Sequence, residues 1–233
     1  MFNKAESTAE RSGSGNRQAL QQQFKDATRR AILDAALELF VADGYARVSL
    51  RNIAAKVGYS PAALYSYFTS KDEIFFALAD EGLRHFGRQE LAAQQLPDPL
   101  EELRASFWRL YLFSTEQPQY FALVFLDRHV PRISREYETF AFMTELRHQM
   151  FARIERCIEA GVFPAGLDTI VAARLLFSAV IGVAALQLSN RLAPNENPDT
   201  LARHAIEVTL AGLRVAGPVA AADAAKHSPD SCT

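Results

Sequence analysis

The chain has few cysteines, Cys157 and Cys232 among its 233 residues. Two cysteines, one of them at the tail, provide no disulfide framework, and such sparing use suits a reducing compartment. A signal sequence is also missing, because residues 1–20 are polar and have no apolar centre. We therefore expect a cytoplasmic protein.

Long hydrophobic runs are absent as well. The most apolar stretch, residues 175–188, is shorter than the roughly twenty residues that a membrane span requires, so it predicts a buried helix and no membrane partner. No alternating strand pattern of any length occurs. These absences favour an all-α fold.

The motifs of the common enzyme classes are missing too. There is no glycine-rich phosphate loop, no nucleophile elbow and no H-E-x-x-H. Metal-like spacings occur at Glu81-x-x-x-His85 and Glu145-x-x-His148, but a di-iron bundle needs two Glu-x-x-His motifs and two further glutamates. We expect no catalytic residue, no metal site and no cofactor.

What the sequence does contain is a pair of short helices joined by a tight turn, over residues 49–71. Gly58 is placed to end the first helix, because glycine adopts the left-handed backbone conformation there without steric strain. Ser60 is placed to cap the second helix and Pro61 to occupy its first position. The apolar side chains at helical spacing are Leu50, Ile53, Ala54 and Val57 in the first helix, with Leu64 and Phe68 pointing inward from the second.

This stretch resembles the helix-turn-helix of TetR-family transcriptional repressors. The matching residues are Ser49, Ile53-Ala54, Gly58, Ser60, Leu64-Tyr65, Phe68 and Lys71. Upstream, the resemblance continues through residues 28–36 and Leu39-Phe40 to Asp43-Gly44-Tyr45, and so covers about the first third of the chain. The density of matches at fixed spacing makes the resemblance specific.

The resemblance implies a homodimer that binds double-stranded operator DNA and is released by a small-molecule inducer. By the same resemblance, bases are contacted by Arg51 and the exposed start of the second helix, and phosphates by residues around it. The first set is Arg51, Pro61, Ala62, Tyr65 and Ser66, the second is Ser49, Ala63, Tyr67 and Lys71, and Ser60 completes the DNA-binding set. Because Pro-Ala-Ala offers no polar base-reading group, specificity should rest on Arg51, the tyrosine and methyl contacts.

The charge of the chain is divided unevenly. Residues 1–71 carry ten Lys and Arg against six Asp and Glu, although the whole chain has a net charge of −2. The excess of basic residues lies where phosphate contacts are expected, and the remainder is acidic.

Proline and glycine punctuation predicts the other elements. We expect a disordered leader over 1–23, a DNA-binding domain over 24–71, a ligand-binding and dimerisation domain over 72–216 and a disordered tail over 217–233. The first helix should run from Phe24 to Asp43. After a connector helix from Asp72 to Gln94, further helices are expected over 100–116, 118–127, 133–160, 168–192 and 198–215.

The last expected helix carries two apolar stripes. One contains Leu201, Ala205, Val208 and Gly212, and the other contains Ile206, Leu210 and Leu213. Two stripes need two apolar partners, either both within one subunit or one in a second copy. The resemblance favours dimerisation through the last two long helices.

Aromatic residues and methionines gather between the two ends of the chain, where the resemblance places an inducer site that would suit an apolar or planar ligand. The candidates are Trp108, Tyr111, Phe121, Phe125, Phe140, Met143, Arg147 and Phe177. Arg147 interrupts an apolar stripe, and a buried guanidinium needs an anion. Its partner is either an internal carboxylate, of Glu136, Glu145 or Asp127, or an acidic group of the ligand.

The sequence therefore predicts a homodimeric transcriptional repressor that responds to a small apolar or aromatic ligand. The alternative is a DNA-binding regulator without an inducer, either constitutive or controlled by a partner.

Overall fold

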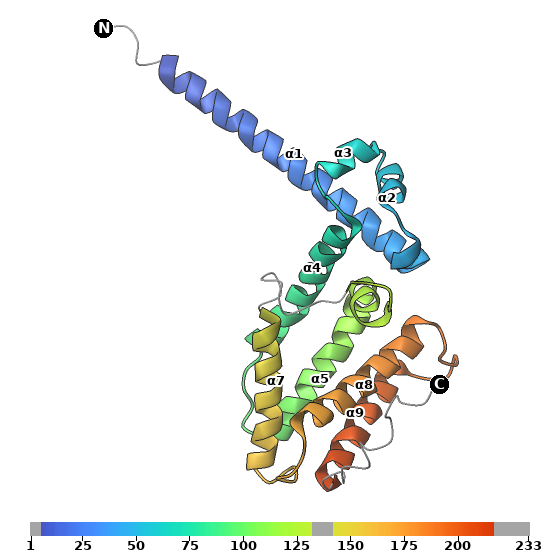
Figure 1. Cartoon of the computed structure of the whole chain (residues 1–233). Helices are drawn as coiled ribbons and strands as arrows, with labels where there is room; N and C mark the ends of the chain where they lie inside the picture. The colour runs from blue at the N-terminus through green and yellow to red at the C-terminus, as the bar shows by residue number, and fades with distance from the viewer. Residues whose placement is uncertain (1–5, 132–141, 217–233) are drawn as a thin grey trace, which may run out of the picture. The chain divides into compact units, whose positions relative to one another are not determined.

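The computed structural model describes residues 6–131 and 142–216, and these ranges contain helices and no strand (Figure 1). The expected all-α fold is confirmed. The described residues form two compact units, 6–82 with 119–131 and 83–118 with 142–216. The division falls inside helix α4 (Lys71–Ala92), after Gly82, and not at residue 71 as expected. The expected tail, 217–233, lies outside the described residues.

Helix α1 (Glu6–Asp43) begins well before Phe24, so the prediction of a disordered leader is wrong for residues 6–23. The side chains of residues 17–27 are all exposed. A helix that buries no face leaves no apolar period in the sequence, which is why the pattern did not reveal it. Residues 17–23 are nevertheless rich in strong helix formers such as Gln, Ala and Leu.

The rest of the first unit builds on the buried end of α1. After the short helix η1 (Tyr45–Arg47) follow α2 (Leu50–Lys56) and α3 (Pro61–Tyr65). Helix α1 packs against α2, and α2 packs against α3. The core of this unit consists of fully or almost fully buried apolar residues, among them Ile32, Ala36, Phe40, Ile53, Ala54, Leu64, Phe68, Ile74 and Phe75.

The segment after α5 differs from the expected α-helix over 118–127. It consists of α6 (Pro118–Phe121) and a turn of π-helix, η2 (Ala122–Leu126), which packs against α1. The N–H of Asp127 donates to the carbonyl of Ala122 at 3.1 Å, a bond that spans five residues. Such turns are rare and often occur at functional positions.

The second unit is a bundle of α5 (Pro99–Glu116), α7 (Phe142–Glu159), α8 (Thr169–Leu188) and α9 (Pro198–Val215). Helices α5, α8 and α9 begin at the side-chain caps Asp98, Asp168 and Asn197. Figure 1 shows α8 and α9 side by side, and α5 packs against α7, α8 and α9. By length and composition alone α8 could cross a membrane, a test that the core helix of a soluble protein also passes.

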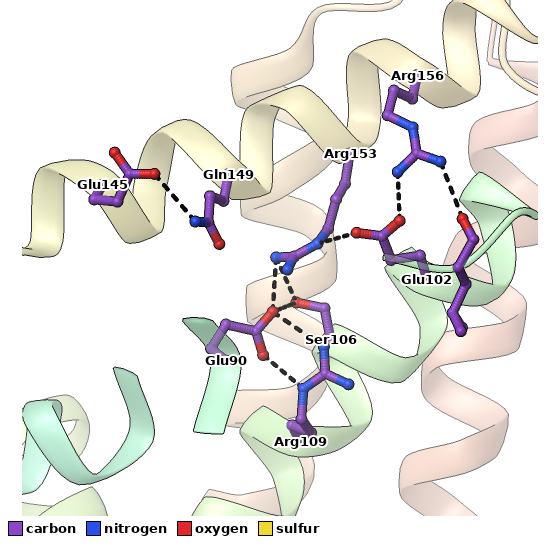
Figure 2. Close-up of polar contacts among 9 residues, drawn as sticks. Glu90, Glu102, Ser106, Arg109, Glu145, Gln149, Arg153 and Arg156 are labelled. Atoms are coloured by element: carbon purple, nitrogen blue, oxygen red, sulfur yellow. Dashed lines mark hydrogen bonds and ion pairs between the residues drawn. The ribbon is translucent and has the colours of Figure 1, made fainter. Parts of the chain in front are cut away.

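A buried cluster of charged residues joins α4, α5 and α7 (Figure 2). Arg153 on α7 is 6% exposed, and its guanidinium lies 2.7 Å from Glu90 and 2.9 Å from Glu102. Glu90 also accepts hydrogen bonds from Ser106 at 2.6 Å and from Arg109 at 2.8 Å. Arg156 completes the cluster by donating to Glu102 and to the carbonyl of Leu96.

The cluster corrects the expectation for Arg147. The buried arginine of α7 is Arg153, and Arg147 is only half-buried. The buried residues of α7 are Leu146, Arg153, Ile154 and Cys157. Among its suggested partners Glu136 lies outside the described residues, and Glu145 accepts a hydrogen bond from Gln149 at 3.0 Å.

The two glutamates of the cluster are ionised in the folded protein at neutral pH. Burial raises the pKa of the Glu90 carboxyl, but the hydrogen bonds from Arg109 and Ser106 and the charge of Arg153 outweigh it, so the pKa lies below its ordinary value. Burial opposes Arg153 and Arg156 in the same way at Glu102, whose pKa is also lowered.

We predict that this cluster makes the protein sensitive to acid. Since the folded pKa values are lowered, the stability that the pairs contribute is present above the unfolded pKa of about 4.3 and is lost as the pH falls through the folded values. Glu90→Gln should lower the free energy of unfolding by about 3–5 kcal/mol at pH 7, because it weakens a buried ion pair. The difference between wild type and Glu90→Gln should be smaller at pH 3, which lies below the unfolded pKa, because the unfolded wild-type chain then binds a proton at this carboxyl.

Urea denaturation at the two pH values, at fixed protein concentration, measures both effects. Glu116→Gln, an exposed residue at the end of α5, is the control and should change little at either pH. An equal loss for Glu90→Gln at pH 7 and pH 3 would contradict the prediction.

Candidate nucleic-acid interface

The start of α2 is fixed by a reciprocal cap. The N–H of Asn52 donates to Oγ of Ser49 at 3.2 Å, and the N–H of Ser49 donates to Oδ1 of Asn52 at 2.9 Å. Asn52 is therefore occupied at the cap. Arg51 beside it is exposed and has no hydrogen-bond or ion-pair partner among the residues that the structure describes. Its guanidinium is available to an external acceptor.

The turn between α2 and α3 has the geometry that the sequence predicts. Gly58 adopts a φ of +72°, in the left-handed region, where L side chains are strained. Ser60 caps α3, because its Oγ accepts the N–H of Ala63 at 3.2 Å, and Pro61 occupies the first turn. These local features orient α3 relative to α2.

The outer side of α3 is small and mostly apolar. Pro61, Ala62 and Ser66 are exposed, and Tyr65 is 55% exposed. The hydroxyl of Ser66 donates to the carbonyl of Ala63 at 2.7 Å, so its proton is already used. On this outer side, the phenol of Tyr65 is the prominent polar group. Ala63 and Tyr67 are half-buried at its edge.

Contacts from α1 and α4 support the two short helices. The guanidinium of Arg29 lies 4.8 Å from the ring of the buried Phe68, and Nζ of Lys56 lies 2.8 Å from Glu38. Nζ of Lys71 donates to the carbonyl of Tyr45 at 2.8 Å and lies 4.1 Å from the centre of its ring. Lys71, predicted as a phosphate ligand, therefore also has a structural role that the sequence pattern did not indicate.

Two family models match the chain. Residues 32–78 match the model of bacterial regulatory proteins of the tetR family, and residues 103–209 match that of the tetracyclin repressor-like C-terminal domain. Together the matches span more than half of the chain. The chain belongs to the TetR family.

Solved structures of bacterial regulatory proteins share the fold. The TetR-family transcriptional regulator PfmR from Thermus thermophilus is 28% identical over 78% of this chain and 98% of its own, with a TM-score of 0.59. A bacterial regulatory protein of the tetR family from Rhodococcus RHA1 is 25% identical over 81% and 98%, with a TM-score of 0.61. The transcriptional regulator FadR from Bacillus subtilis, solved with stearoyl-CoA, is 18% identical over 78% and 98%, with a TM-score of 0.59.

TetR-family membership identifies the helix-turn-helix as a DNA-binding element. All the residues that we predicted to contact DNA lie within 49–71, inside the range of the first family model. Their individual roles stay predictions. Arg51 and Tyr65 are both exposed, and neither has a hydrogen-bond or ion-pair partner among the described residues.

The candidate ligand residues belong partly to the first unit, partly to the second unit and partly to the chain outside the described residues. Phe121 and Phe125, whose ring centres are 4.8 Å apart, belong to the first unit, and Phe140 lies outside the described residues. The others belong to the second unit, where two of them have partners on α9. Arg203 lies 3.8 Å from the ring of Trp108, and the hydroxyl of Tyr111 donates to Asp199 at 2.7 Å. Half-buried positions in this unit are held by Met143, Arg147 and Phe177.

We predict that Arg51→Ala and Lys71→Ala impair DNA binding differently. If Arg51 is bidentate to a guanine, its loss should cost about 1–3 kcal/mol and relax the preference at one position of each half-site. Loss of Lys71 should weaken binding to all DNA sequences alike. It should also lower the slope of the logarithm of the binding constant against the logarithm of salt concentration by about one per phosphate contact. It should also destabilise the first unit, because the Tyr45 carbonyl loses a partner.

Binding to a randomised inverted-repeat library at several salt concentrations separates the two effects. Arg88→Ala, an exposed residue of α4 in the second unit, is the matched control. Identical sequence preferences and identical salt slopes for the Arg51 and Lys71 variants would contradict both assignments.

Proposed function

We propose that the protein is a cytoplasmic, homodimeric transcriptional repressor that binds a palindromic operator and is released by a small apolar or aromatic ligand. The observation that carries the proposal is the reading surface itself. Capped α2 and α3 present Arg51, Pro61, Ala62 and Tyr65 outward on a firmly packed core. Since TetR-family regulators bind DNA through this element, the remaining steps concern the partner copy and the ligand.

The proposed dimer interface lies on α8 and α9. On α9, Ile206, Leu210 and Leu213 of one stripe are buried within the chain, whereas Val208 of the other stripe is 70% exposed. On α8, Leu175 and Leu186 are exposed at 49% and 40%. Two neighbouring helices with apolar residues facing solvent favour a second apolar surface as partner.

Small residues on α8 and α9 would allow helices of a second copy to pack closely against them. A Cβ added at Gly182 on α8 or at Gly212 on α9 would meet no atom within 4 Å. Ser178, which lies between Leu175 and Gly182 in α8, is also exposed. We propose that α8 and α9 of two copies pack together here, as a four-helix arrangement.

The ligand proposal rests on side-chain chemistry. Half-buried Met143 and Phe177 belong to the second unit, and flexible thioether and aromatic side chains suit an apolar ligand. The neighbour from Bacillus subtilis was solved with stearoyl-CoA, but at 18% identity that likeness extends to the fold alone. The second possibility, a regulator without an inducer, is favoured by Trp108 and Tyr111 being already engaged with α9.

Two measurements test the proposal. Selection from random inverted repeats should yield a palindromic site that the dimer binds in a gel-shift assay, and failure to select any site would reject operator binding. Mass spectrometry of molecules that co-purify with the protein, followed by a thermal-shift screen, tests the ligand. If no small molecule stabilises the protein while operator binding is intact, the regulator without an inducer is the better account.

For the dimer, we predict that Val208→Asp produces a folded monomer. A charge at an interface that excludes water costs far more than the same charge on a free surface, where substitutions usually change stability by less than about 0.5 kcal/mol. Light scattering at micromolar concentration should show the mass fall by half. Val41→Asp, at a valine of α1 that is 42% exposed, should leave the dimer intact. A Val208→Asp protein that stays dimeric would place the interface elsewhere.

A further inference from the structure

The first compact unit contains a segment from outside the DNA-binding family match. Residues 119–131 group with residues 6–82, although the match to the DNA-binding model ends at residue 78. The same residues fall within 103–209, the range of the C-terminal domain model. In the structure, they bring two side chains to the reading unit, Tyr120 and Asp127.

Asp127 binds the main chain at the turn before α2. Its Oδ2 accepts the N–H of Tyr45 at 2.9 Å, and its Oδ1 accepts the N–H of His129 at 2.8 Å. A carboxylate acceptor makes a hydrogen bond roughly twice as strong as a neutral one. These bonds and the charge of His129 outweigh the effect of burial and lower the pKa of the Asp127 carboxyl.

Tyr45 is the residue through which this bond acts on the turn. It is 5% exposed, its carbonyl accepts from Lys71, and its hydroxyl donates to Asp72. The centre of its ring lies 5.0 Å from that of Phe40 and 5.7 Å from that of Phe75. Ser49, the cap of α2, follows four positions later in the chain. The position of Tyr45 therefore sets how the chain enters α2.

The second anchor, Tyr120, holds the other end of the segment. Burial and the neighbouring carboxylate of Glu81 raise the pKa of the Tyr120 hydroxyl, and the guanidinium of Arg30 lies 2.6 Å from Glu81. A Cβ at Gly82 would lie 2.8–3.0 Å from the Tyr120 side chain, so this close approach requires glycine. The π-helical turn η2 lies between the two anchors and places Asp127 at Tyr45.

We propose that Asp127 is a positioning residue of the DNA-reading unit, which holds the turn before α2 through the N–H of Tyr45 and thereby sets the placement of Arg51. The segment 119–131 is accordingly part of that unit. The test has two parts. Measuring operator affinity rests on the proposed function, whereas measuring hydrogen exchange does not.

The test uses the full-length protein and hydrogen–deuterium exchange. In Asp127→Ala the N–H of Tyr45 loses its acceptor, so exchange in peptides covering residues 44–56 should speed up about tenfold, the factor that corresponds to about 1.4 kcal/mol. Exchange in α8 should not change. Asp127→Asn keeps an acceptor oxygen and should restore most of the protection. Arg128→Ala, at the exposed neighbouring residue, should exchange as wild type does.

Operator affinity gives the functional arm. On the palindrome selected with wild type, Asp127→Ala should bind at least about fivefold more weakly with an unchanged salt slope, because no phosphate contact is removed. Asp127→Asn should recover affinity. A purely structural role would instead raise exchange in α8 as well and fail to separate the Ala and Asn variants.

Unchanged exchange over 44–56 in Asp127→Ala overturns the proposal, as does faster exchange spread equally through both units. Normal operator affinity in a variant with a loosened turn also overturns it. If wild type selects no DNA at all, operator binding fails, while the exchange result still decides whether Asp127 holds the turn.

Discussion

The hydrogen bonds of Tyr45 fix the turn on which the reading unit depends. Helix η1 is three residues long and begins after Gly44, whose φ is +81°, with no side-chain cap. So short an element has few bonds of its own. The N–H, carbonyl and hydroxyl of Tyr45 bind instead to Asp127, Lys71 and Asp72, respectively. Because Tyr45 is buried, loss of any one leaves a polar group without compensation from water.

In the second unit, too, a few polar contacts fix the positions of elements that apolar residues hold together. Apolar residues of α5, α7 and α8 supply the burial, while Arg153, between Glu90 and Glu102, joins three helices at defined positions. A buried ion pair adds little stability compared with apolar side chains of similar volume. Its geometry is nevertheless strict, because charged groups must meet their partners at hydrogen-bond distance. The cluster therefore fixes the register of α4 relative to α5 and α7.

Local chemistry explains which features the sequence could predict. The caps at Ser49 and Ser60 and the turn at Gly58 depend on residues within a few positions, so each could be located from the chain alone. Non-local contacts could not be located in this way. Arg153 and Glu90 are far apart in sequence, and the apolar period of α7 did not decide which arginine faces inward. The first turns of α1 were missed because an exposed helix has no apolar face. The bond of Asp127 to Tyr45 crosses from one family domain to the other, which no local pattern can indicate.

The position of the proposed ligand in the second unit would determine which other equilibria it affects. Trp108 and Tyr111 both contact α9, through Arg203 and Asp199. The opposite stripe of α9 carries Val208, which we propose meets the partner copy. A ligand that displaced these contacts would shift α9, and by linkage its binding energy would then be coupled to the dimer equilibrium. A ligand held by Met143 and Phe177 alone would leave the α9 contacts in place. Only the first position joins ligand binding to dimer affinity.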